Sequence, residues 1–137
     1  MADGVVIDDV RIVVGRAVPI SMDVKLAGSP HDTTNDGFQF CLKRNESDAD
    51  SDALITKKST LLTGGDDTQI LRVTPDGGVS NSQIHILLTA ADTAALDNVD
   101  RSYFFDVVIS RPGANVHTLI CGTIAFRRSV TVSVQTI

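Results

Sequence analysis

Apolar and polar side chains alternate without a break between residues 17 and 26. One side of this run carries Val18, Ile20, Met22, Val24 and Leu26. A period of two is typical of a β-strand that buries one face and exposes the other to water. Pro19 lies within the run, and a proline cannot donate a hydrogen bond to a neighbouring strand. We therefore expect this strand either to form the edge of a sheet or to carry a bulge at Pro19.

Shorter apolar runs, separated by turn residues, predict the other strands. Residues 37–44 place Phe38, Phe40 and Leu42 on one face, which we expect to point inward. Residues 129–137 alternate weakly and form either a last strand or an extended tail. The remaining strands are expected at residues 5–14, 53–59, 68–74, 80–89, 101–110 and 116–128.

Glycine, proline, asparagine and aspartate mark the connections between these runs. Residues 27–36 and the acidic residues 45–52 are expected to be loops, and residues 111–115 to close a hairpin. The sequences at 64–67 and 75–78 predict tight turns. None of these connections is long enough to separate two hydrophobic cores.

One short segment has helical rather than strand character. Residues 90–96 are rich in alanine, Thr89 can cap a helix, and Asp92 follows three residues later. Aspartate is a shorter version of the glutamate in a capping box, so the match to that motif is partial. About two turns of helix are too short to be stable alone. We expect this helical turn to cross one end of a sandwich.

Seven to nine strands at short spacing predict an all-β fold, a single antiparallel β-sandwich of immunoglobulin-like or jelly-roll-like type. The 137 residues suit one domain, residues 1–137, and a chain of this length can bury a core without disulfides. Aromatic residues make up 4% and tryptophan is absent. The core is therefore expected to consist mainly of valine, isoleucine, leucine and alanine, which suit strands.

The charge balance argues against several classes of partner. The chain has 12 Lys and Arg against 17 Asp and Glu, a net charge of -5, and its basic residues are scattered. Nucleic-acid binding through phosphates needs clustered basic residues, and single-strand binding needs aromatic platforms. No apolar run approaches the roughly 18 residues of a membrane span, and the acidic start lacks the basic region of a secretory signal. We expect neither a nucleic-acid nor a membrane partner.

Residue types that could carry chemistry are present, but their spacing does not fit the chemistry. Asp48, Asp50 and Asp52 resemble the start of a calcium loop, yet the positions that need Gly and Glu hold Ala53 and Ser59. The triplet is better interpreted as a solvated acidic loop. Neither a Gly-x-Ser-x-Gly motif nor a phosphate-binding glycine loop occurs. We expect no catalytic, cofactor-binding or metal-binding residues, no cofactor and no enzymatic activity.

The three histidines fit polar surface positions. His31 lies in a predicted loop near Asp32 and Asp36, and His85 and His117 lie on strand faces opposite the apolar stripes. No two of them have the spacing of paired metal ligands on one element. Polar-face roles are therefore expected rather than metal binding or general-base catalysis.

The two cysteines, Cys41 and Cys121, fall inside predicted strands. They are too few for a disulfide framework and lie away from the helix ends and exposed loops that stabilise a thiolate. We expect free, largely buried thiols rather than a bridge. A cysteine–histidine pair stays open, because such partners meet only in the folded chain.

Tyr103 stands near the start of the strand that follows the helical turn. In immunoglobulin-like sandwiches, a tyrosine at this place can hydrogen-bond back to the preceding turn, an arrangement called the tyrosine corner. Tyr103 is either such a residue or an aromatic of the core or its rim, and the sequence leaves both open.

The clearest resemblance runs from residue 80 to residue 131. Its matching positions are Leu88, Thr89, Asp92, Thr93, Leu96, Tyr103, Asp106, Val107, Thr118, Leu119 and Gly122. This pattern resembles the N-terminal immunoglobulin-like domain of bacteriophage baseplate upper proteins and short stand-alone relatives encoded among the structural genes of tailed phages. The matching positions are expected to shape the fold rather than to bind a ligand. The resemblance implies a structural protein of the virion, made in the host cytoplasm.

The chain ends about where the sandwich ends, which favours an accessory capsid decoration (cement) protein that binds the assembled shell. The implied partners are other virion proteins, namely the major capsid protein or tail and neck proteins, with a homo-oligomer on the particle. The alternative is a tail, neck or baseplate adaptor. A carbohydrate- or cell-surface-binding sandwich is less favoured, because the three long loops contain no aromatic residue. Residues 5–14 and 130–137 are candidate contact segments, unless both are ordinary strands of the sandwich.

Overall fold

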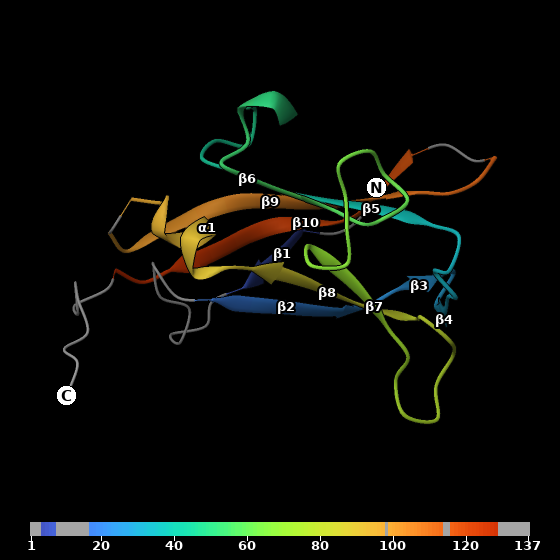
Figure 1. Ribbon diagram of the computed structural model, residues 1–137. Helices are drawn as coiled ribbons and strands as arrows, with labels where there is room; N and C mark the ends of the chain where they lie inside the picture. Colours follow the sequence, from blue (N-terminus) through green and yellow to red (C-terminus); the bar gives the residue numbers. More distant parts are fainter. Residues whose placement is uncertain (1–3, 8–16, 98, 114–115, 129–137) are drawn as a thin grey trace, which may run out of the picture.

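The computed structural model describes residues 4–7, 17–97, 99–113 and 116–128. Its main strands form two layers packed face to face (Figure 1). The five-stranded sheet contains, in spatial order, β1 (Gly4–Ile7), β10 (Val116–Phe126), β9 (Arg101–Ser110), β5 (Gly37–Lys43) and β6 (Ile55–Lys58). The three-stranded sheet contains β2 (Val18–Asp23), β8 (Gln83–Leu88) and β7 (Ile70–Val73). The predicted all-β sandwich is therefore confirmed.

The order of the strands distinguishes between the two sandwich types that the sequence allowed. In immunoglobulin nomenclature, β2 is strand B, β5 is C, β6 is C′, β7 is D, β8 is E, β9 is F and β10 is G. The three-stranded sheet then has the order B-E-D, and β10, β9, β5 and β6 have the order G-F-C-C′, which is the immunoglobulin-like arrangement. One pairing departs from a purely antiparallel sandwich. β1 runs parallel to β10, with Gly4 opposite Cys121 and Ile7 opposite Ile124.

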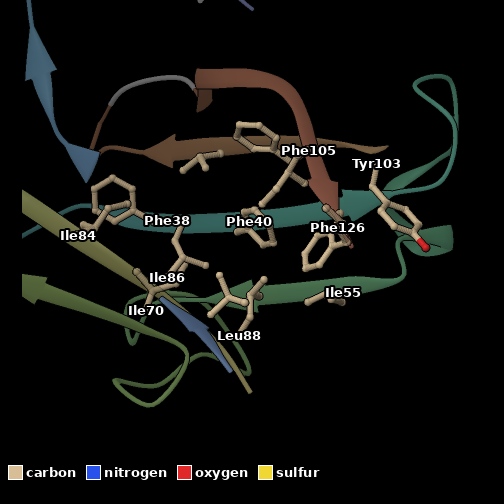
Figure 2. Packing of buried hydrophobic residues seen from close by; sticks show 14 of the residues in the cluster. Phe38, Phe40, Ile55, Ile70, Ile84, Ile86, Leu88, Tyr103, Phe105 and Phe126 are labelled. Atoms are coloured by element: carbon tan, nitrogen blue, oxygen red, sulfur yellow. The ribbon is translucent and has the colours of Figure 1, made fainter. Parts of the chain in front are cut away.

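A single core lies between the sheets. Phe38, Phe40 and Leu42 of β5 are fully buried, as the alternation predicted. Figure 2 shows aromatic rings of the five-stranded sheet packed over aliphatic side chains of the three-stranded sheet. The Phe40 and Phe105 rings stack with their centroids 6.1 Å apart. The Tyr103 and Phe126 rings meet edge to face, with their centroids 5.8 Å apart. Aromatic residues are few, but they occupy the centre of the core.

β2 forms an edge of its sheet, as Pro19 predicted. Val24 N donates to Ser82 O beyond the end of β2, and the same register makes Val18 and Ile20 the residues that exchange hydrogen bonds with β8. The backbone nitrogen of Pro19 therefore faces away from the sheet, where a missing donor costs no ladder hydrogen bond. The sequence prediction that Pro19 marks an edge strand is confirmed.

The predicted loop at residues 27–36 is wrong in its first part. Ala27 and Gly28 both have positive φ, 53° and 80°, which is the backbone that a two-residue hairpin turn needs. The chain therefore folds back on itself, and β3 (Lys25–Leu26) pairs with β4 (Ser29–Pro30). These two short elements raise the described strands to ten, one more than the upper limit predicted from the sequence.

The other boundaries agree closely with the sequence pattern. The strand predicted at 101–110 has these limits, and the one predicted at 116–128 ends two residues earlier. The loop predicted at 45–52 contains a 3₁₀ turn, η1 (Asp50–Asp52). The first predicted strand is described at Gly4–Ile7, and the remainder of 5–14, like 129–137, lies outside the described residues.

The predicted helical turn is α1 (Ala90–Ala94), which joins β8 to β9 at one end of the sandwich (Figure 1). Thr89 Oγ1 accepts a hydrogen bond from Asp92 N at 3.1 Å, and Asp92 Oδ2 accepts one from Thr89 N at 2.8 Å. The capping box is therefore complete, although aspartate replaces the usual glutamate.

Candidate interaction surface

The outer edges of the sheets differ in the backbone groups that they leave for another strand. On β6, Lys58 N donates to Gln69 Oε1 at 2.9 Å and Lys58 O accepts from Asp66 N at 3.2 Å. On β7, Ile70 N donates to Asp66 O at 3.3 Å. The loop between β6 and β7 therefore occupies part of both edges, which makes these strands poor templates for strand addition.

Gly65 allows this loop to lie so close to β6. A Cβ atom at Gly65 would lie 1.9 Å from Ser59 O, a distance at which the two atoms would overlap. Any other residue would push the loop away from the strand. The sequence marked the glycine pair as a turn, whereas Gly65 is required by the close approach of two backbones.

The outer edge of β1 has no partner strand among the described residues. β1 is the outermost strand of the five-stranded sheet, and it pairs with β10 on its inner side. The candidate contact segment at 5–14 is thus, over Gly4–Ile7, a strand of the same sandwich. The rest of that segment and the whole segment 130–137 lie outside the described residues. The outer edge of β1 is the candidate for backbone pairing with another chain.

A hollow of about 310 Å³ lies on the outer face of the five-stranded sheet. Three adjacent strands and the loop after β5 provide its lining, which is Lys43, Glu46, Phe104, Phe105, Asp106, Thr118, Cys121, Gly122 and Thr123. We call it the outer-face hollow. Asp106 pairs with Cys41 on one side and with Cys121 on the other. The three positions therefore form one row across β5, β9 and β10.

A bulge in β10 shapes the outer-face hollow. The register of β10 against β9 shifts between Thr118 and Ile120, which leaves Leu119 as the extra residue. Ile120 and Leu119 pack against the core, whereas Thr118 and Cys121 both line the hollow. A bulge redirects side chains in this way by adding one residue to a regular alternation. No local pattern of residues predicted this bulge.

Of the charged groups around the outer-face hollow, Lys43 forms an ion pair, whereas Asp106 forms none with any described residue. Lys43 Nζ lies 2.6 Å from Asp50 Oδ1. Burial raises the pKa of the Asp106 carboxyl, the positive charge of Lys43 lowers it, and the negative charge of Asp50 raises it again. The net pKa of Asp106 is raised. Sequence reasoning grouped Asp106 with fold-shaping positions, but its carboxylate faces the hollow.

The cysteines of this row do not form a disulfide. Cys41 is 1% exposed, and burial raises the pKa of its thiol, which disfavours the reactive thiolate. Cys121 is only partly buried, because it lines the outer-face hollow. The prediction of a buried thiol therefore holds for Cys41 and holds only in part for Cys121.

The acidic triplet is incorporated into local structure. Asp48 Oδ2 accepts a hydrogen bond from Asn45 N at 3.1 Å, and Asp50 and Asp52 lie in the 3₁₀ turn. Across the described ranges, no group of three or more His, Cys, Asp or Glu residues is arranged to hold a metal ion.

The histidines have separate surroundings. His31 Nε2 lies 2.5 Å from Asp36 Oδ2, and the Asp36 side chain is 5% exposed. His85 is partly buried on β8, on the face opposite Ile84 and Ile86. His117 lies on β10, but its side chain is outside the described residues. The sequence placed His31 near Asp36 only along the chain, and the structure adds a direct contact between the two side chains.

Tyr103 is fully buried, and its hydroxyl has no hydrogen-bond partner within the part of the chain that the structure describes. The hydrogen bond that defines the tyrosine corner is therefore not found among the described residues. Tyr103 is instead a core aromatic beside Phe126 (Figure 2). Arg101 covers it, with Cζ 5.5 Å from the ring centroid.

No model of a known protein family matches the chain, and no curated protein matches it. Among the described helices, none has the length and apolar character needed to cross a membrane. The features from which function can be inferred are the fold, the outer edge of β1 and the outer-face hollow.

Proposed function

We propose that this chain is a non-enzymatic structural protein of a bacteriophage virion, an accessory capsid decoration protein that binds the outside of the assembled shell. The observation that carries the proposal is the place of the resembling positions in the sandwich. Leu88, Leu96 and Tyr103 belong to the core, and Thr89 with Asp92 forms the capping box. The pattern resembling phage virion modules therefore includes residues of the core and the cap of the helical turn that joins β8 to β9.

The surfaces support binding to neighbouring proteins. Among the described strands, none covers the outer edge of β1, which could pair with the backbone of another chain. The outer-face hollow adds a concave site on the face of the same sheet. On a symmetric shell, a contact of modest affinity becomes tight when one subunit engages several neighbours together. The net charge of -5 keeps free subunits soluble before they attach.

Immunogold electron microscopy of intact particles tests this proposal. Antibody against the chain should label the shell over its whole surface, and the chain should be found by mass spectrometry in purified particles. Antibody against an abundant host protein serves as the control. Label confined to one vertex or to the tail would replace decoration by the adaptor function, and absence of the chain from purified particles would refute a virion role.

A reconstitution experiment tests the mechanism. Particles assembled without this chain should bind the purified protein to saturation and sediment with it. The copy number at saturation should follow the symmetry of the shell, because every equivalent site is available. Binding of a few copies per particle would contradict the decoration mechanism.

A further inference from the structure

The outer-face hollow carries negative charge that the protein itself, through Lys43 in the lining, offsets only in part. Lys43 is engaged by Asp50 at 2.6 Å. Neither Asp106 nor Glu46 forms an ion pair with any other described residue, and both line the hollow. Two acidic side chains therefore face the hollow without a directly paired cation.

The lining argues against several kinds of occupant. An anion would meet two carboxylates, which repel it. A metal ion would need a closer set of ligands than the described residues provide. A purely apolar group would remove water from Asp106 without giving the carboxylate a partner, which is costly. A cation with a flat, weakly hydrated head avoids all three difficulties.

Phe104 selects among cations. It lies on β9 two residues before Asp106, so both side chains are on the same face of the strand, and Phe104 also lines the hollow. A guanidinium stacks on an aromatic ring and donates two parallel hydrogen bonds to a carboxylate, whereas an ammonium is compact and strongly hydrated. A volume of about 310 Å³ lies at the small end of ligand sites in proteins, which span roughly 300–1,000 Å³.

We propose that the outer-face hollow receives an arginine side chain from a partner protein, with Asp106 accepting its hydrogen bonds, Glu46 adding charge at the mouth and Phe104 stacking on the guanidinium. This inference rests on the proposed function in one respect, that the partner is another protein of the particle. The arginine itself follows from the hollow. The acidic charge of the whole chain also complements a basic partner.

The position of Asp106 makes the proposal testable without loss of the fold. Burial without a hydrogen bond raises the pKa of Asp106, so the ionised carboxylate costs stability rather than adding to it. Asp106→Asn should therefore leave the melting temperature unchanged or raise it. A variant that weakens binding while keeping or gaining stability separates recognition from folding.

The test is a titration of the ¹⁵N-labelled full chain with N-acetyl-L-arginine amide, followed by NMR. We expect saturable chemical-shift changes at the amides of Phe104, Asp106 and Cys121. The dissociation constant should be millimolar and should rise as salt is added, because salt screens the attraction between the charges. N-acetyl-L-citrulline amide, which has nearly the same shape without the charge, should bind at least tenfold more weakly. Equal shifts with both probes, or no saturable shifts at these amides, would overturn the proposal.

Two variants complete the test. Asp106→Asn should weaken arginine binding at least tenfold, and Asp76→Asn, in the exposed turn at 75–78, should leave it unchanged. An unaltered affinity in Asp106→Asn would refute the proposed role of this carboxylate.

Particle binding separates this inference from the proposed function. If the wild-type chain decorates particles and Asp106→Asn decorates them equally well, the inference fails and the function stands. If the wild-type chain binds the arginine probe but no particle contains it, the function fails and the hollow remains an arginine site.

Discussion

Tyr103 combines complete burial with a hydroxyl that has no hydrogen-bond partner among the described residues. Tyr103→Phe removes this hydroxyl and keeps the ring against Phe126. We expect the free energy of unfolding to stay the same or to rise by up to about 1 kcal/mol, because an unpaired buried polar group is unfavourable. Urea denaturation followed by circular dichroism measures the change.

A control separates the hydroxyl from the ring. Tyr103→Leu should destabilise the protein by about 1–2 kcal/mol, because it loses an aromatic contact and leaves space in the core. A loss of more than about 1 kcal/mol in Tyr103→Phe would show that the hydroxyl has a partner after all, and would restore the tyrosine-corner interpretation.

Single residues also show what sequence reasoning could reach. The buried faces of β2 and β5 follow from alternation alone, because neighbouring side chains on a strand point to opposite sides. Asp106 could not be placed this way. Its role depends on Cys41 and Cys121 lying on either side and on the nearby bulge, and both require the register between strands. The available signal was one carboxylate in the middle of a strand whose central residues are otherwise apolar or aromatic.

At the scale of the element, α1 depends on Asp92 twice. Its carboxylate closes the capping box and also meets Lys57 Nζ at 2.6 Å, which ties the helical turn to β6. Burial raises the pKa of Asp92, but hydrogen bonds from Lys57 and Thr89 outweigh burial, so the pKa is lowered. The ionised form therefore stabilises the folded state.

Asp92→Asn should lower the free energy of unfolding at pH 7 by about 1–2 kcal/mol. The wild-type advantage should be complete above the ordinary carboxyl pKa of 3.8 and should disappear as the pH falls through the lowered pKa of the folded state. Denaturation curves across this range measure both effects. Asp97→Asn, at exposed pairs with Arg44 and Arg101, should change stability by less than about 0.5 kcal/mol. An equal effect of the two variants would contradict the role of Asp92.

Element types followed from the sequence more readily than element ends. The capping residues Thr89 and Asp92 located α1 because their chemistry is local. The hairpin of β3 and β4 was missed because Ala27 adopts a positive φ, which alanine seldom does and which no local pattern announces.

At the scale of the whole molecule, Arg72 joins the two layers. It lies on β7 of the three-stranded sheet, and its guanidinium donates to Thr33 O at 3.0 Å and Asp36 O at 2.6 Å in the segment leading to β5. A third bond reaches Thr60 Oγ1 at 3.2 Å, just beyond β6. The geometry of the three bonds suits a planar guanidinium, since a lysine ammonium has no matching fork.

Arg72→Lys should therefore lower the free energy of unfolding by about 2 kcal/mol, although the charge is kept, because the partner carbonyls lose charge-assisted hydrogen bonds. Arg127→Lys, whose pair with Asp100 is exposed, should have an effect below about 0.5 kcal/mol. Chemical denaturation of both variants gives the comparison, and similar small changes in the two would show that Arg72 does not hold the layers together.

The fold class could be predicted from the sequence because closely spaced strands and turn residues suit a sandwich. The parallel pairing of β1 could not, since nothing in the residues of a short apolar strand states its direction or partner. The Arg72 contacts were equally hidden, because they join positions 36 and 39 residues apart.

The pairing of β1 with β10 has a consequence for biosynthesis. Gly4 lies opposite Cys121, so β1 leaves the ribosome long before its partner exists. The five-stranded sheet cannot close during translation until nearly all the described chain has emerged, and loop closure over so many residues is slow. During this interval β1 lacks the strand with which it pairs in the folded protein. A nascent chain that terminates before residue 116 does not contain β10, so β1 cannot form this pairing.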